Sequence, residues 1–185
     1  MKDYNELIKR FPLLFQHQED SQEPFALFGF ECSIGWYDII EKACETIYSS
    51  YRYNSSRVTE FKYDLDNIDE TVKKRQSWDK DKTREWIIAN TQNFYDTSVK
   101  DLEVSKLELP KFVQIKEKYG SLRLYHDGGN KFSAGVIQYA ELLSTVVCEV
   151  CGNSGQTYHI GWNRTLCKQH AQERYGAQAT DPSKR

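Results

Sequence analysis

Hydrophobic residues recur at helical spacing in three parts of the chain. Residues 3–15 have this spacing with Pro12 interrupting it, which predicts a short, broken helix. Residues 35–51 carry one apolar stripe, typical of an amphipathic helix, made of Trp36, Ile39, Ile40, Ala43, Cys44 and Ile47. Residues 131–147 repeat the spacing. The pattern therefore predicts three helices, with Trp36 buried in the core.

Alternating apolar and polar positions predict strands in two further places. Residues 112–115 and 122–124 alternate on either side of EKYG, where Gly120 can adopt the positive φ of a tight turn. They predict a β-hairpin. Residues 57–65, RVTEFKYDL, alternate as well and predict another strand. The charged stretch after it predicts one or two helices, with Asp79 or Asp81 as the cap between them.

Composition and charge limit the classes of protein that fit. The chain has 185 residues, 39% of them hydrophobic, so it can bury a core of its own. Its formal net charge of −2 excludes nucleic-acid binding driven by a globally basic surface. The start, MKDYNELIKRFPLLF, is unlike a signal peptide, and no apolar run reaches the roughly 18 residues of a membrane span. We therefore expect a cytoplasmic protein.

A cysteine–histidine pattern near the C-terminus predicts a metal site. Cys148 and Cys151 form one C-x2-C pair, and Cys167 with His170 forms a C-x2-H pair after a spacer of fifteen residues. Two short pairs at this separation suit tetrahedral Zn²⁺, because each pair holds one side of the ion. His159, between the pairs, is the alternative fourth ligand.

The expected zinc is structural, because four protein ligands close its coordination shell, whereas catalytic zinc keeps one position open. A deaminase-like H-x-E arrangement is missing from the segment. A nuclease of the His-Asn-His type needs further histidines between the cysteine pairs, and only His159 lies there. We predict an α+β fold: a helix-and-hairpin domain over residues 1–147, a treble-clef-like zinc finger over 148–175 and a flexible tail over 176–185.

Four stretches together resemble a family of small bacterial and phage or prophage proteins of unknown biochemical function. They are FGFECSIGWYDIIEKAC, QIKEKYGSLRLY, AELLSTVVCEVCGNSG and GWNRTLCKQHA. The resemblance covers about residues 25–50 and 112–171, and residues 55–108 look like an insertion relative to shorter members. It implies a phage-associated or defence-associated context and no reaction.

The predicted hairpin also offers a candidate ligand site. Residues 111–126 contain four basic residues and one acidic residue, and the candidates are Lys116, Lys118, Arg123 and Tyr125. Cations beside an aromatic ring can hold a phosphate and stack a base, although the same pattern is typical of a solvated hairpin face. No catalytic constellation stands out, so the residues favour a non-catalytic protein and leave an enzyme as an unsupported alternative.

The leading hypothesis is a non-catalytic, zinc-stabilised binding protein. As a phage accessory protein, it would inhibit host defence by binding a host protein or by sequestering a small anionic nucleotide. The alternatives are a nucleic-acid-binding regulator and, second, a metal-dependent nuclease.

Overall fold

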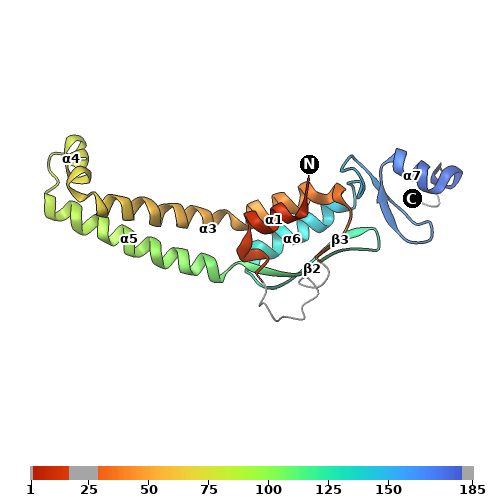
Figure 1. The fold of residues 1–185 in the computed structure, drawn as a ribbon, viewed down its shortest axis with the longest axis horizontal. Coiled ribbons are helices and arrows are strands. Elements are labelled where there is room, and N and C mark those ends of the chain that lie inside the picture. The colour runs from red at the N-terminus through yellow and green to blue at the C-terminus, as the bar shows by residue number, and fades with distance from the viewer. Residues whose placement is uncertain (1, 17–28, 181–185) are drawn as a thin grey trace. The chain divides into compact units, whose positions relative to one another are not determined.

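The computed structural model describes residues 2–16 and 29–180, and the chain divides into two compact units (Figure 1). The first unit comprises residues 1–47 and 109–185, and the second comprises residues 48–108. The mixture of helices and small sheets confirms the α+β class. The described elements are α1 (Tyr4–Arg10), η1 (Pro12–Leu14), β1 (Phe30–Glu31), η2 (Ile34–Trp36), α3 (Tyr37–Asp66), α4 (Ile68–Trp78), α5 (Arg84–Leu107), β2 (Pro110–Lys118), β3 (Ser121–Gly128), α6 (Lys131–Ser144), β4 (Gln156–Tyr158), β5 (Arg164–Leu166), α7 (Lys168–Tyr175) and η3 (Gly176–Thr180).

A three-stranded sheet forms the centre of the first unit, in the order β1-β2-β3. Strand β1 runs parallel to β2, and β2 with β3 forms the predicted antiparallel hairpin, which is thus confirmed. The chain reverses at Tyr119 and Gly120, both of which have positive φ. One face of the hairpin is apolar and buried, and it packs with a core that also contains Phe11, Leu14, Trp36 and Ile40. The predicted burial of Trp36 is therefore confirmed.

Helix α6 covers the outer edge of the sheet. It begins with a capping box in which Asn130 and Ser133 exchange side-chain to backbone hydrogen bonds. From its last turns, the hydroxyl of Ser144 accepts a hydrogen bond from the backbone N–H of Leu122 at 2.8 Å, and Glu141 Oε1 accepts one from Leu124 at 2.9 Å. Side chains of α6 thus satisfy backbone donors of the edge strand β3.

The second unit consists of the C-terminal part of α3 together with α4 and α5. Phe61 of α3 stacks on Phe94 of α5, with ring centroids 5.5 Å apart. Asn54, two helical turns before Phe61, donates to the backbone oxygen of Asp101 at 3.2 Å. Earlier residues of α3 therefore meet later residues of α5, so the two helices run antiparallel, as Figure 1 shows.

The strand predicted over residues 57–65 is wrong, because α3 continues through Asp66 without a break. Val58, Phe61 and Leu65 alternate with polar residues, but they also recur at i, i+3 and i+7, so the same positions fit a helical stripe. Of the two residues predicted as a cap between the helices, Asp79 occupies the C-cap position of α4. The N-cap of α5 is neither of them: the hydroxyl of Thr83 accepts from Trp86 N at 3.2 Å.

The C-terminal segment, residues 148–180, contains the hairpin β4–β5 followed by α7 and η3. Its small core comprises Cys148, Tyr158, Leu166, Cys167, Ala171 and Ala179. Residues 176–180, which the sequence assigns to a tail, form η3 and contribute the buried Ala179. Residues 181–185 lie outside the described residues.

Candidate metal centre

The first cysteine pair lies on a backbone knuckle that begins four residues after α6. The N–H of Gly152 donates to the carbonyl oxygen of Cys148 at 2.9 Å, and the N–H of Cys148 donates to Asn153 O at 2.7 Å. Gly152 has φ of 80°, a conformation that glycine adopts without steric cost. The knuckle brings the thiols of Cys148 and Cys151 to the same side of the chain.

The second ligand pair lies where β5 leads into α7. Cys167 occupies the N-cap position of α7, and His170 is in the first turn of that helix. Residues three apart lie on one face of a helix start, so both side chains point in one direction. Interaction with the backbone N–H of His170 lowers the pKa of the Cys167 thiol to about 7, which favours the thiolate that metals bind.

The four predicted ligands form one cluster, and their ligand atoms all lie within 4.8 Å of one another. His170 Nδ1 is 3.5 Å from Cys148 Sγ and 3.2 Å from Cys167 Sγ, and the sulfurs of Cys151 and Cys167 are 3.9 Å apart. A tetrahedral zinc shell with ordinary bond lengths separates two sulfurs by about 3.8 Å, and a sulfur from a nitrogen by about 3.5 Å. The cluster has dimensions that could hold a metal ion. His159 is exposed and is not part of it.

The second ring nitrogen of His170 faces an acidic side chain. Its Nε2 lies 4.0 Å from Glu173 Oε2, one turn further along α7. This distance is too long for a hydrogen bond but short enough for electrostatic attraction. A carboxylate at this position favours the tautomer that carries the proton on Nε2 and leaves Nδ1 free to bind a metal.

The knuckle packs directly against the turn that starts the first long helix. The N–H of Gly35 donates to Glu149 O at 2.8 Å, and the indole N–H of Trp36 donates to Val147 O at 2.8 Å. A Cβ on Gly35 would stand 2.4 Å from the carbonyl oxygen of Cys148. The Gly-Trp dipeptide therefore lets the two backbones approach closely and holds them together.

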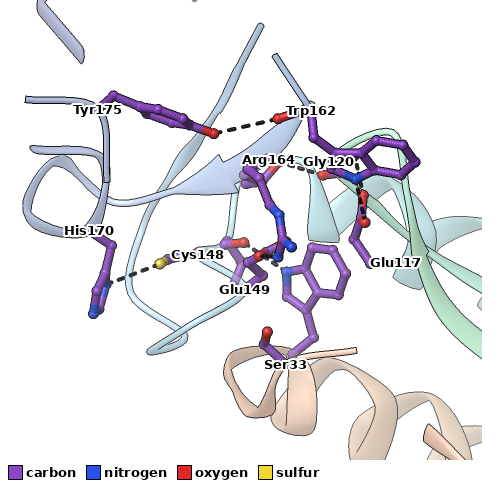
Figure 2. Close-up of polar contacts among 12 residues, drawn as sticks. Ser33, Glu117, Gly120, Cys148, Glu149, Trp162, Arg164, His170 and Tyr175 are labelled. Carbon is purple, nitrogen blue, oxygen red and sulfur yellow. Dashed lines mark hydrogen bonds and ion pairs between the residues drawn. The ribbon is translucent and has the colours of Figure 1, made fainter. Parts of the chain in front are cut away.

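The hairpin turn packs against the other side of the C-terminal segment. The hydroxyl of Thr165 donates to Gly120 O at 2.6 Å, and the indole of Trp162 donates to Glu117 Oε2 at 2.9 Å (Figure 2). A Cβ on Gly120 would come within 2.9 Å of a methyl group of Thr157. The cluster of candidate metal ligands is thus part of a segment that is anchored to both the helix start and the β2–β3 turn.

A buried ion pair lies beside the cluster of candidate metal ligands. Glu149 is only 1% exposed, and its Oε1 accepts a hydrogen bond from Arg164 of β5 (Figure 2). Burial raises the pKa of the Glu149 carboxyl, while the Arg164 guanidinium acts in the opposite direction. Breaking such a pair from one side leaves an uncompensated buried charge, so the pair fixes β5 against the knuckle.

The predicted ligand-binding residues share one face of the hairpin. Lys116 and Arg123 are direct cross-strand partners, and the Lys116 ammonium lies 5.3 Å from the centre of the Tyr125 ring. Arg123, however, donates to Leu122 O at 2.9 Å and lies 3.7 Å from Glu141 Oε2 of α6. Lys118 lies over a different ring, that of Tyr119, at 5.7 Å. Lys116 and Tyr125 are thus together, whereas Arg123 is paired with a carboxylate.

Several contacts of this site were not predicted from the residues. Glu149 and Arg164 pair across the C-terminal segment, and Glu117 joins the hairpin to Trp162. One local signal existed: Glu149 is a charged residue within the apolar run VVCEVC. A lone charge among apolar residues and ligands indicates a buried partner, but it does not identify Arg164 as that partner.

Comparison with known proteins adds no relative: no family model, no curated protein and no solved structure matches the chain. Among the described residues, no helix combines the length and the apolar character needed to cross a membrane.

Proposed function

We propose that this chain is a non-catalytic binding protein in which a structural Zn²⁺ ion holds a treble-clef-like finger on an α+β domain. The supporting observation is the cluster of Cys148, Cys151, Cys167 and His170, whose ligand atoms lie within 4.8 Å of one another. The order of the parts also supports a treble clef: a knuckle, the short hairpin β4–β5, and a helix whose start carries the second ligand pair.

The donor set favours zinc over other metals. Three cysteine sulfurs and one imidazole are soft and borderline donors, which suit Zn²⁺ and do not suit Mg²⁺ or Ca²⁺. Four protein ligands also fill a tetrahedral shell, so the proposed ion supplies binding energy to the fold and keeps no position for a substrate.

The segment that carries the cluster needs this stabilisation. Most of the buried residues in its core have small side chains, namely Ala171, Ala179 and the two cysteines Cys148 and Cys167. A bound ion would crosslink the knuckle to α7 and preserve the surface built from Glu117, Trp162 and the hairpin turn. The proposed role of the metal is therefore to maintain a binding surface.

The proposed ligand is a host protein or a small anionic nucleotide, and the proposed setting is inhibition of host defence by a phage or prophage. The resemblance in the Gly-Trp, KEKYGSLRLY and cysteine motifs supports that setting. Nucleic-acid binding is the second candidate, because exposed aromatic rings and lysine lie together at the β2–β3 turn.

Metal analysis of the purified chain tests the structural role. We expect one zinc per chain, and we expect Cys167→Ser to lose it and to melt at a lower temperature, because a missing thiolate opens the shell. Cys32→Ser is the matched control, since Cys32 lies outside the cluster and should leave the zinc content unchanged. Parent protein without zinc, or a Cys167→Ser variant that melts like the parent, would contradict the proposal.

A further inference from the structure

The turn between β2 and β3 contains an unusual backbone conformation. Among the residues that the structure describes, Tyr119 is the one non-glycine residue with positive φ, at 54°, and Gly120 follows at 82°. Two consecutive positive φ angles are what a type I′ hairpin turn requires, and Asn or Gly is strongly preferred at its first position. A bulky aromatic residue is disfavoured there, so another property of Tyr119 must account for its presence.

Packing of the core does not account for Tyr119. Its side chain is 63% exposed, and its ring lies beside that of Trp162, which is 57% exposed. The two ring centroids are 6.3 Å apart and the ring planes differ by 26°. This aromatic pair, Tyr119 and Trp162, therefore presents two nearly parallel rings to solvent, contributed by the hairpin turn and by the C-terminal segment.

The aromatic pair is held in place by one acidic residue. Glu117 Oε1 accepts a hydrogen bond from the N–H of Gly120 at 2.7 Å, and its Oε2 accepts one from the Trp162 indole at 2.9 Å (Figure 2). Both carboxylate oxygens are thus engaged with the turn and the indole. Orienting the rings in advance lowers the entropic cost of stacking a flat ligand upon them.

A cation completes the surface. The exposed Lys118 ammonium lies 5.7 Å from the centre of the Tyr119 ring, and Lys116 lies on the same face of the hairpin two residues earlier. Aromatic rings stack bases, and neighbouring lysines bind the phosphate attached to them. We propose that the aromatic pair with Lys118 forms a binding site for a phosphorylated nucleoside, either free or within a single strand of nucleic acid. This site rests on the proposed binding function and specifies its ligand.

Substituting Tyr119 separates this role from a structural one. Tyr119→Asn places a residue that favours the type I′ turn, so the melting temperature should rise by about 2–4 °C. The same variant loses a stacking ring, so its affinity should fall roughly fivefold or more. A gain in stability combined with a loss of binding is the signature of a strained residue retained for function.

Fluorescence anisotropy with a labelled oligothymidylate of about ten nucleotides, at low salt, measures that affinity. Trp162→Ala should weaken binding as Tyr119→Asn does, and Lys118→Ala should weaken it and reduce the salt dependence. Trp78→Ala is the matched control, because Trp78 is 76% exposed but lies in the second unit, and it should bind like the parent.

Competition by AMP at concentrations similar to those of the oligonucleotide would assign the site to free nucleotides. Binding of the oligonucleotide without competition would assign it to single strands.

Three results would overturn the proposal. They are failure of the parent to bind either probe, an equal loss of binding in Trp78→Ala, and a Tyr119→Asn variant that melts lower and loses binding only in proportion. Zinc is measured in the same samples. A parent that binds zinc but neither probe overturns this site alone, whereas a parent without zinc overturns the structural role of the metal.

Discussion

Gly35 illustrates at the scale of one residue how the C-terminal segment is joined to the rest of its unit. It lies in η2, where the backbone conformation suits many residues, and its φ is not positive. The requirement for glycine comes from a neighbour: the Cys148 carbonyl oxygen would be 2.4 Å from an added Cβ, and the Glu149 carbonyl oxygen 2.5 Å. Both atoms belong to a backbone that is fixed by its own hydrogen bonds, so neither can move away easily.

We predict that Gly35→Ala destabilises the chain by about 1–3 kcal/mol or more, because it overpacks the contact with the knuckle. Gly135→Ala is the matched control. A Cβ at Gly135 meets nothing within 4 Å, and alanine in the middle of α6 should stabilise the fold by about 0.5–1 kcal/mol. Chemical denaturation of both variants measures the difference. If Gly35→Ala were as stable as Gly135→Ala, the knuckle would not contact Gly35 closely.

Residue-level chemistry was predictable where it is local in sequence. The two ligand pairs each span four consecutive positions, so their spacing alone indicated Cys148, Cys151, Cys167 and His170. The pairing of Glu149 with Arg164 was not predictable, because the fold and not the spacing brings these residues together. The position of Lys118 beside Tyr119, away from Tyr125, also depends on the shape of the turn.

At the scale of elements, the hairpin and α6 are connected through Arg123. Its guanidinium lies 3.7 Å from Glu141 Oε2, while Glu141 Oε1 accepts from the backbone of Leu124. The sequence places Arg123 among the ligand-binding candidates because it lies in a basic stretch, whereas its contact with Glu141 favours a structural role. The structure adds a partner that the stretch alone does not show.

We expect Arg123→Lys to lower the free energy of unfolding by less than about 1 kcal/mol, since part-exposed ion pairs contribute little. Glu141→Gln is the matched variant, because it removes the charge from the other side and keeps an oxygen for Leu124. Thermal melts of the two variants should show similar small decreases in melting temperature, and their affinity for the oligonucleotide should stay within about twofold of the parent. A large loss of affinity in Arg123→Lys with an unchanged melting temperature would instead support the ligand-binding role.

Element boundaries show the limits of periodicity. The two longer predicted helices and the hairpin exist, because each has a long pattern or a distinct turn residue. Their ends differ from the predicted ones: α3 continues past residue 51 to Asp66, and α6 ends at Ser144 instead of residue 147. The strand predicted over residues 57–65 was wrong because a short alternating run also fits a helical stripe. Antiparallel packing of α3 against α5 favours the helix. Such pairing depends on residues more than thirty positions away, as Phe61 and Phe94 show.

At the scale of the whole molecule, the two units differ in what they bury. The buried residues of the second unit are mostly small or hydroxylated, and they are Tyr48, Thr71, Val72, Ile87, Thr91, Ser98 and Ser105. The first unit buries large side chains, such as Trp36, Phe11 and Phe112. Because apolar burial is the main stabilising contribution, the second unit should be the less stable one.

We therefore predict two thermal transitions, of which only one depends on metal. A chelator should lower the melting temperature of the first unit, which contains the candidate metal ligands. The melting temperature of the helical second unit, residues 48–108, should change by less than about 2 °C. Calorimetry with and without chelator, followed by far-ultraviolet circular dichroism, makes the comparison. Cys167→Ser should reproduce the effect of the chelator. One transition that shifts as a whole would show that the continuous helix α3 couples the units.

The covered edge of β3 has a consequence for the behaviour of the protein in a crowded solution. Unpaired N–H groups on an edge strand are templates for strand addition by another chain, and such addition is a route to aggregation. The side chains of Ser144 and Glu141 occupy the N–H groups of Leu122 and Leu124, so this edge is closed to a neighbouring molecule while α6 is in place. Any change that loosens α6 would uncover an aromatic, β-prone segment, FVQIKEKYGSLRLY. The helix therefore protects the chain from self-association as well as stabilising the sheet.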